Sequence, residues 1–274
     1  MKVVGLGFAT VKGTRHLSRE RVTLDEHGPV GDRAFVVVDV ARSKVLRTLS
    51  NRTLVAVQAE GDGETLALEL PTGEAASGPA TLTRDSVTCE YWGRTVTHVL
   101  TDGPHSELLS DHLGKPVRLA ASPRGGAVYG APVSILTTAS LRDLGERTGR
   151  NDLLESVSRF RMTMVVDAGD EPYVEDSWFG RELQVGDAVV RVRTAVGRCG
   201  QIDMAPATGD KDGSLLKALA GYRPSHGGEP WFGIDALVVV PGDVRLGDLL
   251  TVSGGGARHR RKLTTARGPA PTER

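Results

Sequence analysis

Cys199 follows a predicted strand at residues 189–194 and has surroundings that suit a reactive thiolate. Arg198 precedes the cysteine, and a glycine on each side of the Arg–Cys pair leaves room for approach. A thiolate that binds a metal or attacks a substrate needs such access and nearby positive charge, which Arg198 and Arg193 can supply. A lone cysteine can also be a small buried apolar residue. The pattern leaves both roles open for Cys199.

The other cysteine, Cys89, lies in an alternating, strand-like run without nearby arginines, and we interpret it as a packing residue. The two cysteines are far apart and have no CxxC or Cys/His ligand spacing, so a zinc site of the usual kind is not predicted. A disulfide is not expected in a reducing compartment.

Basic residues beside predicted strands are the candidate anion-binding groups. Arg33 follows a Gly-Asp turn at the start of a strand, where its guanidinium could bind a phosphate through two hydrogen bonds. Lys12 begins a Lys-Gly-Thr fragment of a phosphate-binding loop, although the rest of such a loop is missing. Arg159 and Arg161 precede an apolar strand, and alternation predicts that they share one face. Each arginine could instead form a structural ion pair or lie on a solvated edge.

The elements that would position these residues are mostly short strands. Glycine (34 residues) and proline (14) are abundant and aromatic residues make up only 4%, which favours strands and turns over long helices. The patterns predict strands at residues 33–39, 52–60, 66–70, 80–83, 95–100, 132–137, 164–167, 182–185, 188–194, 236–240 and 249–252. Helical spacing appears at residues 105–113, 141–154 and 215–219, with Thr138 or Ser140 as an N-cap.

Composition excludes several classes of protein. The 274 residues carry 34 Lys and Arg against 34 Asp and Glu, and this zero net charge argues against a non-specific nucleic-acid binder. No apolar stretch reaches the length of a membrane span, and the beginning of the chain does not read as a secretory signal. We therefore expect a cytoplasmic protein with no membrane or nucleic-acid partner. The Gly-rich, basic residues 254–274 are expected to be disordered.

Eight motifs in order resemble those of the MOSC superfamily, which is named for the C-terminal domain of molybdenum cofactor sulfurase. The chain is similar to longer members with an N-terminal β-barrel, such as the mitochondrial amidoxime-reducing component and its bacterial relatives. The match extends to about residue 252. Its N-terminal motifs are TVKG at residues 10–13 (family PVKS), GPVGDRAFVVVD at 28–39 (GLxGDRxFMLVD) and HSELLSDHLGKPVRL at 105–119 (WLSxFLGxPVRL).

The motifs of the C-terminal half continue the resemblance. They are APVSILTTASL at residues 131–141 (family YPxxLxSxASL), RFRMTMVVD at 159–167 (RFRPNxVVD), EDSWFGRELQV at 175–185 (EDxWxxLxI), the Arg-Cys pair with PATG at 206–209 (RCxxTTVDPDTG), and WFG at 231–233 with VRLGD at 244–248 (FGxY and IxVGD). Each motif is weak alone, and their order makes the resemblance specific.

The resemblance implies a mainly β fold with a few helices. A β-rich, barrel-like N-terminal region would cover residues 1–120, and a β-barrel MOSC domain would cover residues 121–253. It also implies a ligand, the molybdenum cofactor (Mo-molybdopterin), with Cys199 as the thiolate ligand of the metal. The cofactor-binding residues that it implies are Lys12, Arg33, Thr138, Ser140, Arg161, Thr163 and Arg198.

Four positions depart from the family pattern, and one of them is VYG at residues 128–130 in place of the family's ADG. Met162-Thr163 replaces the family's Pro-Asn, which removes or weakens one amide contact to the pterin. Leu49 stands where the family often has an arginine, although Arg47 lies close. The family's TTVD becomes IDMA at residues 202–205, which puts the carboxyl group of Asp203 near the implied metal as a candidate catalytic proton donor.

The implied activity is that of an oxidoreductase. It would reduce small N-hydroxylated or N-oxide substrates by oxygen-atom transfer at a Cys-ligated molybdenum. No heme, flavin or iron–sulfur motif is visible, so electrons would come from a separate protein. Two alternatives stay open: a sulfurtransferase that carries a persulfide on Cys199, and a cofactor carrier without turnover.

Overall fold

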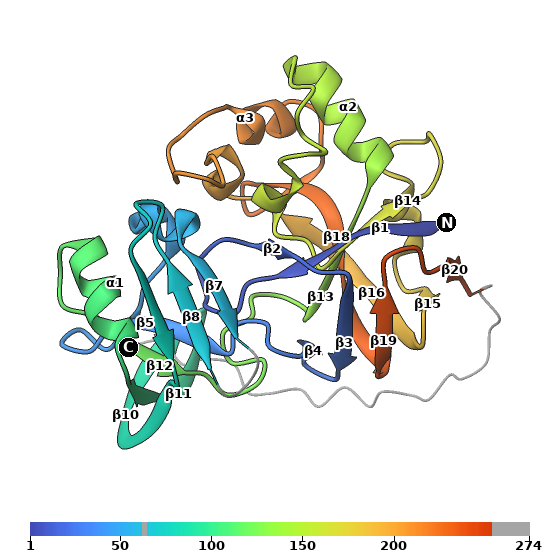
Figure 1. Cartoon of the computed structure of the whole chain (residues 1–274). Helices are drawn as coiled ribbons and strands as arrows, with labels where there is room; N and C mark the ends of the chain where they lie inside the picture. Colours follow the sequence, from blue (N-terminus) through green and yellow to red (C-terminus); the bar gives the residue numbers. More distant parts are fainter. Residues whose placement is uncertain (62–64, 254–274) are drawn as a thin grey trace, which may run out of the picture.

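The computed structural model describes residues 1–61 and 65–253, and this part of the chain is mainly β with a few helices, as predicted (Figure 1). The basic segment 254–274 lies outside the described residues. The α-helices are α1 (His105–Leu113), α2 (Thr138–Thr148) and α3 (Leu215–Ala220). The described residues also form five short 3-10 helices: η1 (Thr48–Ser50), η2 (Arg52–Ala56), η3 (Val157–Phe160), η4 (Val174–Trp178) and η5 (Gly200–Asp203).

The largest sheet has the strand order β2-β1-β14-β13-β18-β16-β15-β20, with β17 paired to β18. The pair β13 and β14 is parallel and is connected through α2, whereas the other pairs are antiparallel. Its strands are β1 (Lys2–Phe8), β2 (Leu17–Ser18), β13 (Val133–Thr137), β14 (Met164–Asp167), β15 (Glu182–Val185), β16 (Ala188–Gly197), β17 (Ser225–His226), β18 (Glu229–Val240) and β20 (Leu250–Val252).

The described residues form three smaller sheets besides this one. The first has the order β10-β11-β12-β5-β6, the second β7-β8-β9 and the third β19-β3-β4. Their strands are β3 (Arg21–Asp25), β4 (Gly28–Pro29), β5 (Phe35–Asp39), β6 (Lys44–Val45), β7 (Gln58–Gly61), β8 (Leu66–Glu69), β9 (Ala75–Gly78), β10 (Thr81–Tyr91), β11 (Arg94–Asp102), β12 (Arg118–Ala121) and β19 (Gly242–Arg245).

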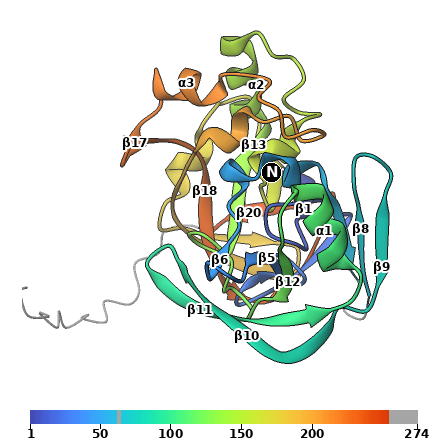
Figure 2. The same cartoon turned by 90° about the vertical axis from the view of Figure 1, so that its left-hand side faces the viewer.

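The beginning of the chain completes sheets of the C-terminal half. Strand β1 pairs with β14 and β3 pairs with β19, and Figure 1 shows both contacts. The motifs and the spacing of the strands predict a division of the chain near residue 120. In the structure, however, strands from residues 1–30 pair with strands of the C-terminal half. Figure 2 shows α1, β10 and β11 on one side of the molecule, away from α2 and α3.

Apolar side chains fill both faces of the large sheet. On one face, Ile135 and Met164 belong to a cluster with residues of β3 and β19. On the other face, Leu136 and Val165 pack against leucines of α2 and α3. Because neighbouring residues of a strand point to opposite faces, the continuous apolar runs of β13 and β14 are explained by burial on both sides.

Several predicted elements are confirmed and others are corrected. The helix at 105–113 and the strands at 164–167 and 182–185 have the predicted bounds, and the Gly186-Asp187 turn joins β15 to β16 as a hairpin. Residues 52–56 form a 3-10 helix instead of a strand, because Leu54, Val55 and Ala56 are buried in succession without alternation. None of the described helices is long and apolar enough to cross a bilayer.

The N-cap of α2 is Thr137, not Thr138 or Ser140. The backbone of Thr137 is extended, and its hydroxyl accepts a hydrogen bond from the amide of Ser140. The predicted N-cap is one or three residues too late because Thr137, Thr138 and Ser140 all carry a hydroxyl group that could cap a helix. The helix ends at Thr148, so residues 153–154 lie in a turn and not in a helix.

Candidate functional site

Four cations from distant parts of the chain meet beside β1 and β14: Lys12, Arg33, Arg47 and Arg161, which we call the basic cluster. The charges of Arg33, Arg161 and Arg47 each lower the pKa of Lys12. The carboxylate of Asp32 has the opposite effect and raises it. Asp32 is already paired with Arg33. The cluster therefore holds more positive charge than its own acidic group can neutralise.

The electrostatics of Lys12 reflect this excess of charge. Burial, together with the smaller effects of the three arginines, lowers the pKa of Lys12 from 10.5 to about 7. The Lys12 ammonium also lies 5.2 Å from the ring centre of Tyr91 and 4.9 Å from that of Trp92. A lysine with a depressed pKa among arginines is the arrangement expected of a site that receives an anion.

Arg33 and Arg161 are held in unusual backbone conformations. Their φ angles are +47° and +54°, in the left-handed region that residues other than glycine rarely adopt. Arg161 donates from Nη1 to the carbonyl oxygen of Thr14 at 2.6 Å, and burial lowers its pKa to about 10. Such conformations cost energy. They are found in turns, at helix ends (Arg161 ends η3) and at functional sites, so they are compatible with a binding role for both arginines.

His16 is a neighbour of the cluster that the sequence analysis missed. Burial lowers the pKa of His16 to about 3, with smaller contributions from Arg161 and Arg33. Its Nε2 atom is buried and has no hydrogen-bond partner among the described residues. No motif marked this histidine, because only the fold brings residue 16 beside residues 33 and 161.

Cys199 lies two residues beyond the end of β16, directly before η5, and is partly exposed, while Cys89 is buried as predicted. The guanidinium of Arg198 is buried behind it and donates to the carbonyl oxygens of Phe160 (2.8 Å) and Phe232 (2.6 Å). Burial lowers the pKa of Arg198 to about 10, and the charge of Cys199 opposes that change. Among the ion pairs of the described chain, none includes Arg198. A thiolate at Cys199 would therefore be a fitting counter-charge.

The segment that carries Cys199 packs against the segment that carries Arg47. A side-chain carbon at Gly200 would lie 3.6 Å from Leu49, and η1 contacts η5. Arg15 also donates to the carbonyl oxygen of Ala207 at 3.2 Å. These contacts bring the segment of the partly exposed thiol next to a segment that carries one member of the basic cluster, at a junction between the two halves of the chain.

Thr163 and Asp203 are placed near this junction but have hydrogen-bond partners of their own. The Thr163 hydroxyl accepts from the amide of Ser134, and the Thr163 amide donates to the Ser134 hydroxyl, both at 3.1 Å. One oxygen of Asp203 accepts from the amide of Leu216 at 3.0 Å, in the first turn of α3. Asp203 therefore caps a helix, and its role as a proton donor stays a prediction.

Ser140 and Thr138 lie at the other end of β13 from Thr163. Ser134, which contacts Thr163, lies four residue steps before Thr138, or roughly 13 Å at about 3.3 Å per step along a strand. The Ser140 hydroxyl is fully buried and donates to Glu175 at 2.8 Å. The hydroxyl oxygen of Thr138 is buried without a partner in the described chain. The structure does not bring these two residues to the basic cluster.

Arg159 does not share a face with Arg161, so that prediction was wrong. Residues 157–160 form the 3-10 helix η3, and the left-handed backbone of Arg161 turns its side chain toward Thr14. Arg159 is buried and pairs with Asp212 through two contacts of 2.9 Å. Likewise, Arg193 pairs with Asp235 at 2.7 Å, so its charge is already neutralised.

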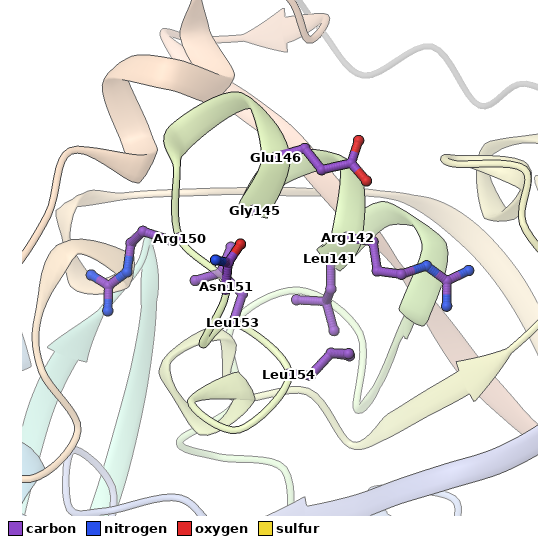
Figure 3. A pocket seen from close by; sticks show the side chains of 8 residues that line it. All are labelled: Leu141, Arg142, Gly145, Glu146, Arg150, Asn151, Leu153 and Leu154. Atoms are coloured by element: carbon purple, nitrogen blue, oxygen red, sulfur yellow. The ribbon is translucent and has the colours of Figure 1, made fainter.

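Two surface pockets lie away from this junction. One of about 150 Å³ is lined by α2 and the turn that follows it, and Figure 3 shows Leu141, Leu153 and Leu154 at its centre. The other, of about 240 Å³, lies on the sheet β7-β8-β9. Neither includes Cys199 or a member of the basic cluster. We therefore place the candidate site at the basic cluster and Cys199 and not at either pocket. The described residues contain no group of three His, Cys, Asp or Glu arranged to hold a metal ion.

Comparison with known protein families places two domains on the chain. The model of the MOSC domain matches residues 110–251, and the model of the MOSC N-terminal beta barrel domain matches residues 1–116. The residues of the basic cluster come from both matched regions, and Cys199 lies within the region that matches the MOSC domain.

Similar proteins include the molybdenum cofactor sulfurase of Caenorhabditis elegans, which is 26% identical over 81% of this chain and 31% of its own length. The molybdenum cofactor sulfurase of Caenorhabditis briggsae is 32% identical over 39% of this chain and 15% of its own length. This chain thus spans less than a third of these relatives. The YuaD protein from Bacillus subtilis aligns over 92% of this chain and 94% of its own, with 13% identity and a TM-score of 0.45.

Proposed function

The chain belongs to the MOSC family, and on that basis we propose that it binds the molybdenum cofactor between its two halves. The observation that carries this proposal is the basic cluster, in which four cations face one carboxylate and the pKa of Lys12 falls to about 7. The cofactor's phosphate is an anion of the kind that such a cluster would bind.

Different residues of the junction would bind the phosphate and the metal of the cofactor. Arg33 and Arg161 would donate hydrogen bonds to the phosphate, and Lys12 would add a point charge. The Cys199 thiolate would bind the metal, and Arg198 would stabilise that thiolate from behind while the carbonyls of Phe160 and Phe232 hold its guanidinium in place. When bound, the cofactor supplies a metal that exchanges oxygen atoms and electrons.

The reaction that we propose is the reduction of small N-hydroxylated or N-oxide substrates. Cys199 is partly exposed, so a substrate can approach the metal that its thiolate would bind. Asp203 is the candidate that would deliver a proton to the oxygen that leaves the substrate. Electrons would come from a separate electron-transfer protein.

A sulfurtransferase is the second candidate, and the named relatives favour it. In this function the Cys199 thiolate would attack the outer sulfur of a donor persulfide and release the donor's thiolate. The new persulfide on Cys199 would then pass its outer sulfur to a thiophilic acceptor and return to a thiolate. A carrier that binds the cofactor without turnover is the third possibility.

The test is a paired analysis of protein made in a host that synthesises the cofactor. We expect molybdenum and pterin in the wild-type protein and in Cys89→Ala, and no molybdenum in Cys199→Ala with an unchanged circular dichroism spectrum. Full metal in Cys199→Ala would refute the ligand assignment. Cyanide-released sulfur that depends on Cys199, without molybdenum, would favour the sulfurtransferase.

A further inference from the structure

Three aromatic side chains gather beside the basic cluster. Trp92 lies 4.0 Å from Tyr91 and 4.6 Å from Tyr129, measured between ring centres, and Lys12 lies over both Tyr91 and Trp92. Trp92 is 40% exposed and Tyr129 is 58% exposed. In a chain with only 4% aromatic residues, such an exposed group next to the candidate site needs an explanation.

The position of Trp92 in the backbone is costly. Trp92 and Gly93 form the two-residue turn between β10 and β11, where Tyr91 pairs with Arg94. Both turn residues have positive φ angles, +49° and +75°, as in a type I′ turn, which favours Asn-Gly. A bulky side chain at such a position is an outlier, and backbone outliers of this kind cluster at functional sites.

We propose that Trp92 and Tyr129 form a stacking surface for a planar aromatic ring beside the basic cluster. Aromatic rings stack in offset or tilted pairs, and the exposed ring of Tyr129 extends the surface that Trp92 begins. Lys12 would hold the anionic part of a ligand while the ring stacks next to it. The inference rests on the proposed function, because it names the kind of molecule that this site receives.

The ring has two possible sources, the pterin of the cofactor and an aromatic substrate. Both can be tested with cofactor-free protein, so the outcome does not depend on metal loading. The probes are pterin without a phosphate, and a matched pair of oximes, benzaldehyde oxime and cyclohexanecarbaldehyde oxime. The two oximes have similar size and reacting groups and differ in the planarity of the ring.

We expect the wild-type protein to bind pterin or benzaldehyde oxime in a fluorescence or NMR titration, and the cyclohexane compound more weakly. Trp92→Asn should weaken that binding about tenfold, the effect of losing roughly one stacked ring. The same variant should raise the melting temperature by about 2 °C, because asparagine suits the turn. A purely structural Trp92 would not combine weaker binding with greater stability.

The matched control is Phe179→Ala, which removes another exposed aromatic residue from a pair with Trp231. It should leave both affinities within twofold of the wild type, whereas Tyr129→Ala should weaken binding. An effect confined to pterin assigns the surface to the cofactor, and one confined to the oxime assigns it to the substrate. The proposal is overturned if the wild-type protein binds neither planar probe, if the cyclohexane oxime binds equally well, or if Trp92→Asn changes neither affinity. Molybdenum content reports separately on the proposed function.

Discussion

Arg161 donates a hydrogen bond to the carbonyl oxygen of Thr14 at 2.6 Å, and this contact joins segments that are 147 residues apart. It fixes one guanidinium edge of Arg161 beside the loop that carries Lys12. The other three members of the basic cluster come from the first fifty residues of the chain. The anion site therefore exists only when the two halves are packed together.

Arg161→Met should lower retention of the cofactor roughly 10- to 100-fold, since a hydrogen bond to a charged group contributes about 1.5–3 kcal/mol. Arg161→Lys should retain part of the binding because the charge remains. The measurement is molybdenum and pterin content after gel filtration. Arg191→Met, which removes an exposed arginine paired with Glu182, is the control and should bind normally. Equal retention in Arg161→Met would count against the basic cluster as the phosphate site.

Sulfate affinity should fall as the pH rises through about 7, because Lys12 then loses the proton that attracts an anion. Sulfate is a suitable probe, since it stays a dianion over this range. His16 contributes nothing to the change because its pKa is lowered to about 3, and Arg161 stays charged. Calorimetry between pH 6 and 8.5 measures the effect. Lys12→Met should bind sulfate weakly and with little pH dependence, and an equally steep dependence in that variant would assign the titration to another group.

Lys12 should also cost stability, and the sign of its pH dependence follows from the lowered pKa. The folded value is about 7 and the unfolded value about 10.5, so between these limits the unfolded chain binds more protons. Stability from this group therefore rises with pH over that window, and the full penalty applies below pH 7. We expect Lys12→Met to raise the melting temperature by about 2–4 °C at pH 6 and less at pH 9. If Lys12→Met melts at a lower temperature than the wild-type protein at pH 6, the charge of Lys12 does not destabilise the fold.

Much of the fold could be predicted because many of its strands and helices have local sequence patterns, with turn residues at their ends. The strand at residues 182–185 and the helix at 105–113 have clear periods, and the strand at 164–167 is a short apolar run. The 3-10 helix at residues 52–56 was missed because a short buried run of Leu, Val and Ala carries no period that separates it from a strand. The pairing of β1 with β14 could not be read from the sequence, since register between distant strands leaves no local pattern.

The candidate site was predictable only in part. Cys199, Lys12, Arg33 and Arg161 were identified by motif, and the structure brings the three cations together. His16 and Trp92 were missed because their importance comes from what the fold places beside them. Arg198 was identified as functional by its motif. Its hydrogen bonds to the carbonyl oxygens of Phe160 and Phe232 could not be predicted, because the fold brings these distant residues together.

Arg198→Met should destabilise the fold by about 2–4 kcal/mol, because two buried carbonyl oxygens lose their donors. In the fraction that folds, alkylation of Cys199 by iodoacetamide at pH 7 should slow, since the buried positive charge behind the thiolate is gone. Arg198→Lys is the matched variant that keeps the charge, and it should alkylate faster than Arg198→Met. Mass spectrometry separates Cys199 from the buried Cys89. Equal rates in the wild-type protein and both variants would show that Arg198 acts on packing alone.

Asp203 offers a test that separates a helix cap from a proton donor. Its carboxylate accepts from the amide of Leu216, so Asp203→Ala should lower stability by about 1 kcal/mol, the usual contribution of a cap. Asp203→Asn keeps an acceptor oxygen and should restore most of that stability, but it cannot donate an acidic proton. If Asp203 is the proton donor, Asp203→Asn should reduce turnover at least 100-fold and flatten the pH–rate profile while binding the cofactor normally. If Asp203→Asn is as active as the wild-type protein, Asp203 is a cap only, and the proton reaches the substrate from another group.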